Sequence, residues 1–223
     1  MHEGFQRART DQQREHRRHE ILTVTRDLLS GQRVATVSLN EIARQVGLAK
    51  SNVLRYYGSR EAILLVLLAD EYRAWVADVE TSLLTGDEPD PVEHVAATLA
   101  ATAATRPLLC ELLTATPTVL EHNVTPGEVT TFKLTVAAQM ERLIASLAHH
   151  LGPWNDEAKG VFLGGLHALI TGMWSLAHPS PALAEAMRTD NRIRGLPHGL
   201  EASLRESLAT LLTGLQHREP RLQ

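Results

Sequence analysis

Residues 38–61 read SLNEIARQVGLAKSNVLRYYGSRE, and this stretch predicts two short helices joined by a glycine turn. Ser38 is followed three residues later by Glu41, a spacing typical of a capping box at the start of a helix. Apolar residues then recur at the spacing of one helix face, and Gly47 can adopt the left-handed conformation that ends a helix. A second short helix comes next, and Ser59 can cap the helix that follows it.

The second short helix has few apolar residues with which to pack. We expect Val53, Leu54 and Tyr57 to form its packing face. The other side chains, which are polar or cationic, are expected to point away from the core: Lys50, Ser51, Asn52, Arg55 and Tyr56. Two helices joined by a tight turn, the second rich in donors and cations, form the helix-turn-helix arrangement that lays a recognition helix in the major groove of DNA.

The sequence of residues 47–61 resembles the recognition-helix signature of the tetracycline-repressor (TetR) family, and the resemblance covers about residues 15–65. Ala49 stands where the family usually has Ser or Thr, and Leu54 stands where it most often has a phosphate-binding Tyr. The resemblance implies an all-helical fold, in which a three-helix DNA-binding domain precedes a helical domain that binds an effector and dimerises. The matching residues are Gly47, Leu48, Lys50, Val53, Tyr56, Tyr57, Ser59, Arg60 and Glu61.

Several side chains of this stretch are candidates for DNA contacts. Arg55 is the best candidate for reading a base, because a guanidinium matches the O6 and N7 acceptors of guanine and discriminates by about 1–3 kcal/mol. By the resemblance, Arg60 would grip the DNA backbone at the start of the fourth helix. The alternative for these side chains is a solvated polar helix face. The predicted DNA-binding set is Ser38, Lys50, Ser51, Asn52, Arg55, Tyr56 and Arg60.

Charge is distributed unevenly along the chain. Residues 1–60 hold 11 Lys and Arg against 6 Asp and Glu, whereas the whole chain holds 22 against 26. A basic N-terminal quarter on an acidic remainder predicts that only the first part contacts a polyanion. Together with the family resemblance, this boundary implies a helix-turn-helix DNA-binding domain at residues 1–60 and a helical effector-binding and dimerisation domain at residues 61–223. The Arg-rich run at residues 7–18 fits a DNA-contacting arm and a solvated helix face equally well, because Asp11 and Glu15 dilute it.

The composition is that of a soluble globular protein, with 43% apolar and 22% charged residues among 223. The single cysteine, Cys110, excludes an internal disulfide and a multi-cysteine zinc site. The N-terminus is too polar for a secretory signal. The most apolar window, residues 161–177, contains His167, so we interpret it as a buried helix and not as a membrane span. We expect a cytoplasmic protein without a membrane partner.

Helical periodicity continues through the rest of the chain. A first helix is expected from residues 10–14 to residues 29–30, ahead of the helix-turn-helix stretch. A long helix is expected from Ser59 to about Leu83. Further helices are expected to begin at Asp90–Pro91, Pro107, Pro117 and Thr125–Pro126, and the last two to span residues 154–177 and 199–216.

The helix expected at residues 154–177 carries small residues every four positions. Glycine inside a helix costs roughly 0.5–1 kcal/mol, so a strip of such residues predicts that another helix passes very close. By the family resemblance, the helices at 154–177 and 199–216 would pair across a symmetric homodimer. The alternative is that they close the core of one monomer. The small residues are Gly160, Gly164, Ala168 and Gly172.

The sequence favours no enzyme, because it lacks GxSxG, P-loop and HExxH motifs, and we expect no metal and no cofactor. Family members bind a small molecule inside the helical C-terminal domain. The effector-binding candidates implied here are polar or aromatic residues on apolar helices, although a core or surface role is the alternative for each. We expect an aliphatic pocket with one or two polar anchors. The candidates are Trp75, Arg106, Glu111, His122, Phe132, His167 and Trp174.

The resulting hypothesis is a ligand-responsive transcriptional regulator, and specifically a repressor. It would bind a palindromic double-stranded operator as a dimer and be released by a small-molecule inducer that shifts the helix starting at Ser59. A helical scaffold or adaptor that has lost DNA binding is the first alternative, supported by Ala49 and Leu54. A small-molecule enzyme using the C-terminal cavity is the second, disfavoured because no nucleophile–base pair stands out.

Overall fold

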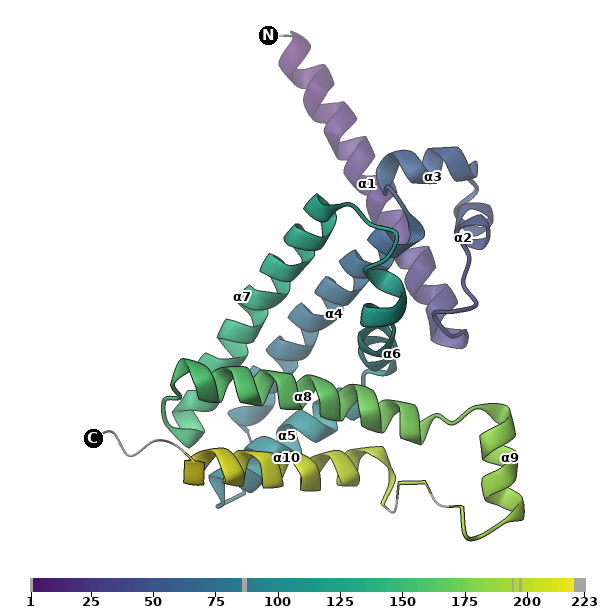
Figure 1. Ribbon diagram of the computed structural model, residues 1–223. Coiled ribbons are helices and arrows are strands. Elements are labelled where there is room, and N and C mark those ends of the chain that lie inside the picture. The colour runs from purple at the N-terminus through teal and green to yellow at the C-terminus, as the bar shows by residue number, and fades with distance from the viewer. Residues whose placement is uncertain (1, 86–87, 194, 197, 219–223) are drawn as a thin grey trace. The chain divides into compact units, whose positions relative to one another are not determined.

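A computed structural model describes residues 2–85, 88–193, 195–196 and 198–218, with side chains from residue 12 onward (Figure 1). Helices occupy most of these residues, which include no strand, and this confirms the predicted all-helical fold. The elements in order are α1 (His2–Gly31), α2 (Leu39–Val46), α3 (Lys50–Tyr56), α4 (Arg60–Leu83), α5 (Pro91–Ala104), α6 (Pro107–Ala115), the π-helical turn η1 (Thr116–Leu120), α7 (Pro126–Leu151), α8 (Asp156–Ala177), α9 (Pro181–Thr189) and α10 (Gly199–Arg218).

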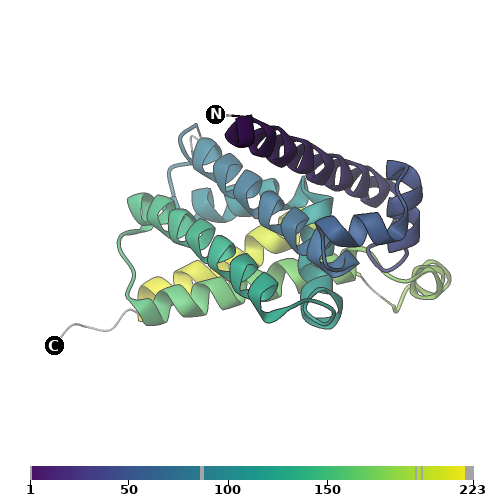
Figure 2. The same cartoon turned by 90° about the horizontal axis from the view of Figure 1, so that it is seen from above.

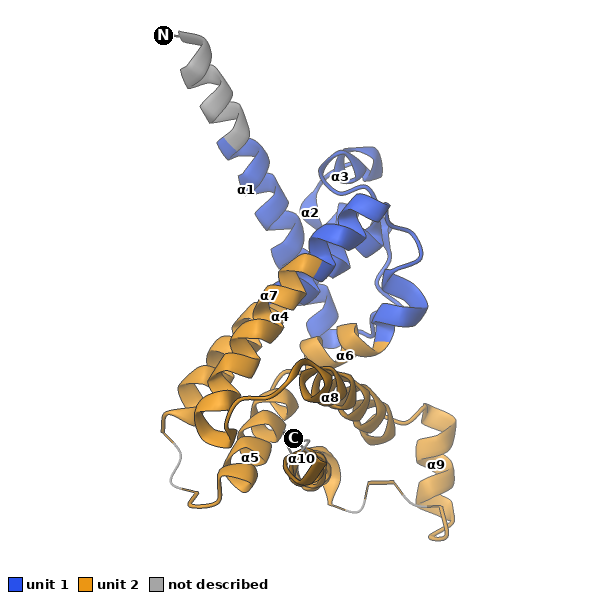
Figure 3. Ribbon diagram, turned by 60° about the vertical axis from the view of Figure 1, so that its left-hand side comes forward, with its two compact units in different colours: residues 1–70, 115–133 blue, residues 71–114, 134–223 orange. Residues whose placement is uncertain are grey.

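The chain divides into two compact units, coloured separately in Figure 3. Unit 1 comprises Met1–Asp70 and Ala115–Lys133, and unit 2 comprises Glu71–Thr114 and Leu134–Gln223. The long helices α4 and α7 each contribute residues to both units. The expected boundary between residues 60 and 61 stays a prediction.

Unit 1 contains the helix-turn-helix stretch, and its core is built from one side of each of α1, α2 and α3. Thr25 is fully buried, and its hydroxyl donates to the Ile21 carbonyl at 2.7 Å, so the polar atom is satisfied inside the helix. Helix α1 begins earlier than the predicted residues 10–14, because the preceding residues contain no proline and are rich in Gln, Arg and Glu, which favour helix. The buried residues of the three helices include Ile21, Thr25, Ile42, Ala43 and Val53.

The predicted caps fix where these helices start and stop. The Ser38 hydroxyl accepts a hydrogen bond from the Glu41 amide at 3.2 Å, and the Glu41 carboxylate accepts one from Gln32 Nε2. Gly47 has φ of 73°, in the left-handed region that glycine tolerates best, and it ends α2 as predicted. At the start of α4, the Ser59 hydroxyl accepts from the Ala62 amide at 3.0 Å.

Unit 2 contains α5, α8 and α10, with α10 packed against both of the others (Figures 1 and 2). Three of the seven buried residues of α5 are alanines, whose small side chains let α10 approach closely. An ion pair between Arg205 on α10 and Glu93 on α5, at 2.9 Å, also joins the two helices. The leucines of α10 that fill this core are Leu204, Leu208, Leu212 and Leu215.

The prediction of a buried helix at residues 161–177 was wrong for the single chain. Only one stripe of α8 is buried, through Phe162, Leu166, Ile170 and Trp174. Most other residues of α8 are exposed or half-buried although the helix is apolar, because α10 packs along one side of it; Leu176 is 58% exposed. By length and composition alone this helix could cross a membrane, and 22% of its apolar window is buried.

Two elements differ from expectation in the middle and late parts of the chain. The helix expected to begin at Pro117 is a single π-helical turn that continues directly from α6. Helix α9 was not predicted, and none of its nine residues is buried. Its start does carry a recognisable signal, since the Ser180 hydroxyl caps it by accepting from the Leu183 amide and Pro181 occupies the first helical position.

Candidate nucleic-acid interface

Helix α3 presents most of its polar side chains to solvent. Val53 on the opposite face is fully buried, and Tyr57 directly after the helix is 4% exposed, so these two residues anchor it. Leu54 is 38% exposed, which corrects the prediction that it packs in the core, because it lies one position away from the buried stripe. The exposed polar residues are Lys50, Ser51, Asn52 and Arg55, and Tyr56 is half-buried.

Arg18 on α1 holds the end of α3 in place, a role that the sequence analysis missed. Its Nη1 donates to the carbonyl oxygen of Tyr56 at 2.6 Å, which satisfies an acceptor at the end of α3. Its guanidinium carbon lies 4.3 Å from the centroid of the Tyr57 ring, within the range of a cation–π contact. The Tyr57 hydroxyl in turn donates to the Arg18 carbonyl at 3.2 Å. Burial raises the pKa of Tyr57 to about 12, although the nearby Arg18 charge acts in the opposite direction.

Arg60 is half-buried and already bonded to protein groups, unlike the exposed DNA-binding candidates of α3. Its side chain is 19% exposed, and its Nη1 donates to the Val37 carbonyl at 2.9 Å. Its Nε donates to the carboxylate of Glu61, also at 2.9 Å, and Glu61 is itself buried. Arg60 therefore ties the segment before α2 to the start of α4. The predicted contacts of Arg60 and Ser38 with DNA stay predictions.

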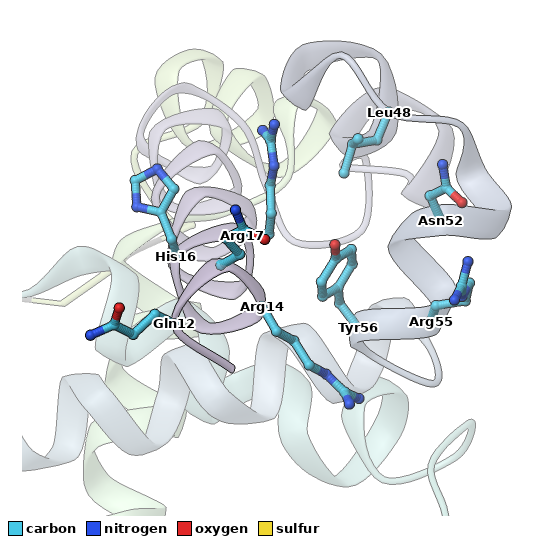
Figure 4. Close-up of a pocket in the computed structure, with 9 residues that line it drawn as sticks. Gln12, Arg14, His16, Arg17, Leu48, Asn52, Arg55 and Tyr56 are labelled. Atoms are coloured by element: carbon cyan, nitrogen blue, oxygen red, sulfur yellow. The ribbon is translucent and has the colours of Figure 1, made fainter. Parts of the chain in front are cut away.

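A groove lies between α1 and α3, with a volume of about 1040 Å³ (Figure 4). Side chains of α1 line one side and side chains of α3 line the other, with Tyr56 between them. Its nine lining residues include three arginines and no carboxylate. We call this the α1–α3 groove, and its lining residues are Gln12, Gln13, Arg14, His16, Arg17, Leu48, Asn52, Arg55 and Tyr56.

One acidic side chain on α1 holds two of the groove residues. Glu20 Oε2 lies 2.6 Å from Nη1 of Arg17, and Glu20 Oε1 lies 3.2 Å from Nε2 of His16. The Arg17 side chain is 47% exposed and the His16 side chain 72% exposed, so both pairs are open to water. Pairs of this kind are weak and easily exchanged for another anion.

One effector-binding candidate lines a hollow in unit 2. This residue is Trp174 on α8, whose Nε1 donates to Glu111 Oε2 at 3.0 Å. The ring of His178 stacks on it with the centroids 3.7 Å apart. The hollow has a volume of about 730 Å³ and is largely apolar, with His178 and Glu201 as its ionisable side chains. Its other lining residues are Ala104, Pro107, Leu176, Ala177, Pro179, Met187, Gly195, Leu196, Gly199 and Leu200.

Apart from Glu111, which accepts the hydrogen bond from Trp174, the other effector-binding candidates do not gather around Trp174. Trp75 is buried and donates to the Thr102 hydroxyl at 3.0 Å. Arg106 forms ion pairs with Glu71 and Asp78. His167 is exposed on α8, whereas His122 and Phe132 belong to unit 1. No group of three or more His, Cys, Asp or Glu residues that could hold a metal ion occurs among the described side chains.

Two family models match the chain and together cover most of it. Residues 21–67 match a model described as bacterial regulatory proteins of the tetR family. Residues 69–219 match a model described as the tetracyclin repressor-like C-terminal domain. No curated protein matches the chain significantly.

Three solved structures share the fold. Thermus thermophilus FadR, a TetR-family repressor in complex with lauroyl-CoA, has a TM-score of 0.58 at 16% identity, over 92% of this chain and 98% of that one. The fatty acid degradation regulator FadR from Bacillus halodurans has a TM-score of 0.56 at 14% identity, over 88% of this chain and 98% of that one. RolR in complex with resorcinol has a TM-score of 0.54 at 18% identity, over 89% of this chain and 95% of that one.

Proposed function

Because this chain belongs to the TetR family of transcriptional regulators, we propose that it is a homodimeric repressor that binds a palindromic operator and is released by a small molecule. The observation that carries the proposal is the arrangement of α3. Val53 and Tyr57 anchor one face of this helix, while Lys50, Asn52 and Arg55 are exposed on the other. A helix presented in this way after a glycine turn is suited to entering a major groove.

The exposed residues of α3 have distinct proposed roles. Arg55 reads a guanine through its O6 and N7 atoms, since a bidentate guanidinium contact specifies that base. Ser51 and Asn52 are short, so they bring the start of α3 close to the bases or the backbone. Lys50 and Tyr56 bind phosphates. Ser38 and Arg60 complete the predicted set, with Arg60 exchanging part of its present contacts for a phosphate.

The exposed face of α8 supports the proposed dimer. Methyl groups placed on Gly160, Gly164 and Gly172 would meet no atom within 4 Å, so the face they form is open in the single chain. Exposed apolar residues adjoin this strip, among them Val161 and Leu176. Burying such a face against its copy through α8 and α10 removes apolar surface from water and lets the two backbones approach closely. Two recognition helices would then bind two half-sites about one helical turn apart.

Release by a small molecule requires the ligand to bind one arrangement of the dimer better than the other. The hollow beside Trp174 is the proposed effector site. Its apolar lining, together with His178 and Glu201, fits a ligand with an apolar body and a polar group. Helix α4 is the proposed link, because its residues belong to both units.

The DNA proposal is tested by selecting operator duplexes from a random pool with the purified protein and then footprinting the selected sequence. We expect a palindromic, salt-sensitive footprint with the wild type, and its loss with Arg55→Ala. Arg188→Ala is a matched control, because it removes an exposed arginine that pairs with Glu185 on α9. Failure to enrich any sequence would contradict the proposal.

The effector proposal is tested by mass spectrometry of small molecules that co-purify with the protein. Lauroyl-CoA and resorcinol, bound by two structural relatives, serve as first probes in a thermal-shift assay. We expect a ligand that raises the melting temperature of the wild type to do so less for Trp174→Phe, and to release the selected operator.

A helical scaffold without DNA binding is the second candidate, and one observation favours it. Ala49 precedes α3 without any side-chain hydrogen bond to cap the helix. A missing cap costs about 0.5–2 kcal/mol of helix stability, which would make α3 less stable as a recognition helix. If the scaffold were the function, the protein would sediment identically with and without the selected duplexes, and Ala49→Ser would not change this.

A further inference from the structure

The α1–α3 groove extends the DNA-binding surface beyond the helix-turn-helix motif. We propose that this groove holds the sugar-phosphate strand that runs beside the recognition helix, and that Arg14 and Arg17 on α1 bind its phosphates. This inference rests on the proposed function, because it requires duplex DNA to be bound at α3.

The chemistry of the lining selects a polyanion. Arginines, side-chain amides and a tyrosine hydroxyl supply hydrogen-bond donors along both walls, and Leu48 is the only aliphatic residue among the nine. A carboxylate, which would repel phosphate, is absent from this lining. Most protein–DNA hydrogen bonds go to phosphate and sugar, and they come from side chains of these kinds.

The position of the groove selects a strand of DNA. Arg55 and Asn52 on α3 line the same groove as Arg14 and Arg17 on α1 (Figure 4). A base contacted by Arg55 therefore places its own backbone next to this groove. The arginines of α1 then face phosphates and not base edges, so they contribute affinity without sequence preference.

Glu20 on α1 occupies the position that a DNA phosphate would take beside Arg17. Its carboxylate holds Arg17 and His16 while no phosphate is present. A bound phosphate would take over Arg17, and Glu20 would oppose it through its charge. Removing the charge of Glu20 should therefore strengthen DNA binding, a result that a purely structural role for α1 does not produce.

The arginines of the run at residues 7–18 would have different roles under this proposal. The sequence fits a DNA-contacting arm and a solvated face equally well. Arg14 and Arg17 line the groove, whereas Arg18 is turned to Tyr56 and Tyr57 and serves the fold. The side chains of Arg7 and Arg9 lie outside the described residues.

The experiment measures binding of the full-length protein to two labelled duplexes by fluorescence anisotropy over a series of salt concentrations. One duplex carries the sequence selected by the wild type, and the other is a scrambled duplex of equal length and composition. The test variants are Arg14→Ala/Arg17→Ala and Glu20→Gln. The matched controls are Arg188→Ala/Arg192→Ala, which removes two ion-paired arginines near α9, and Glu141→Gln, which removes an exposed carboxylate on α7.

We expect the double arginine variant to reduce the slope of log affinity against log salt by about 1 to 2, because each lost phosphate contact removes about 0.9. Its affinity should fall by the same factor for both duplexes. Glu20→Gln should bind both duplexes several-fold more tightly than the wild type. The two control variants should match the wild type, and circular dichroism should give unchanged helix content for every variant.

Other outcomes separate this inference from the proposed function. An unchanged slope and affinity in the double variant, with selective binding intact, overturns the inference alone. A loss confined to the selected duplex also overturns it, because the arginines would then read bases. If the wild type binds both duplexes equally and the slope still falls in the double variant, the inference stands and the operator proposal fails.

Discussion

Arg18 and Tyr57 contact each other twice, once through each side chain. The Arg18 guanidinium lies 4.3 Å from the centroid of the Tyr57 ring, and the Tyr57 hydroxyl donates to the Arg18 carbonyl at 3.2 Å. With the bond from Arg18 to the Tyr56 carbonyl, these contacts fix the end of α3 against α1. The recognition helix is therefore oriented by a residue outside the helix-turn-helix motif.

Replacing Arg18 should weaken both the fold of unit 1 and operator binding. We expect Arg18→Ala to lower the free energy of unfolding by about 1–2 kcal/mol, because a charge-assisted hydrogen bond and a cation–π contact are lost. Urea unfolding followed by circular dichroism measures this effect. Arg14→Ala, which removes an exposed arginine of the same helix, provides a comparison; a larger loss there than for Arg18→Ala would contradict the assigned role.

The raised pKa of Tyr57 should make stability depend on pH in the alkaline range. Because the folded value is about 12 and the ordinary value is 10.0, the folded state holds the proton more tightly. This contribution to stability is complete below pH 10 and is lost as the pH rises toward 12. We expect Tyr57→Phe to show a shallower decline over this window than the wild type, measured by urea unfolding at each pH. Parallel curves would argue against the buried phenol.

A substitution at Gly164 on α8 should affect dimerisation without destabilising the fold of the single chain. A Cβ at this position meets no atom within 4 Å in the single chain. Gly164→Leu should therefore stabilise the isolated helix by about 0.8 kcal/mol, since leucine is the better helix former. The same side chain would obstruct a second α8, so sedimentation velocity should show more monomer. A dimer of undiminished affinity would place the interface elsewhere.

The neighbouring glycine has the opposite role. A Cβ on Gly165 would lie 2.7 Å from Cδ2 of Leu211, so this residue lets α8 and α10 pack closely within one chain. We expect Gly165→Ala to lower the melting temperature, because Leu211 must move out of its place in the packing. The matched variant Gly164→Ala should not lower it. Equal melting temperatures for the two alanine variants would show that Leu211 adapts without cost.

Cys110 should react with thiol reagents only when the protein unfolds. It is 1% exposed, its Sγ donates to the Ala103 carbonyl at 3.4 Å, and burial raises the thiol pKa to about 12. The thiolate is the reactive form, so both access and ionisation protect the residue. A chromogenic disulfide reagent should titrate one thiol in denaturant and almost none in the native protein. Rapid reaction under native conditions would contradict this packing.

The sequence was sufficient for those features that depend on residues close together in the chain. The Ser38 cap, the left-handed Gly47 and the Val53–Tyr57 spacing define the helix-turn-helix, because capping and helical periodicity act within a few residues. Most helix starts followed from similar local signals. The same signals identified Lys50, Asn52 and Arg55 as exposed.

Contacts between distant residues could not be predicted in this way. No local pattern pairs Arg18 with Tyr57, turns Arg60 toward Val37 and Glu61, or places a groove between α1 and α3. It also indicated a buried helix at 161–177, because composition reports how apolar a helix is but not how many of its sides meet a neighbour. Local order along the chain was determined by the sequence itself. The partners of side chains such as Arg18 and Arg60 were decided by tertiary packing, since they depend on which surfaces the helices bury against one another.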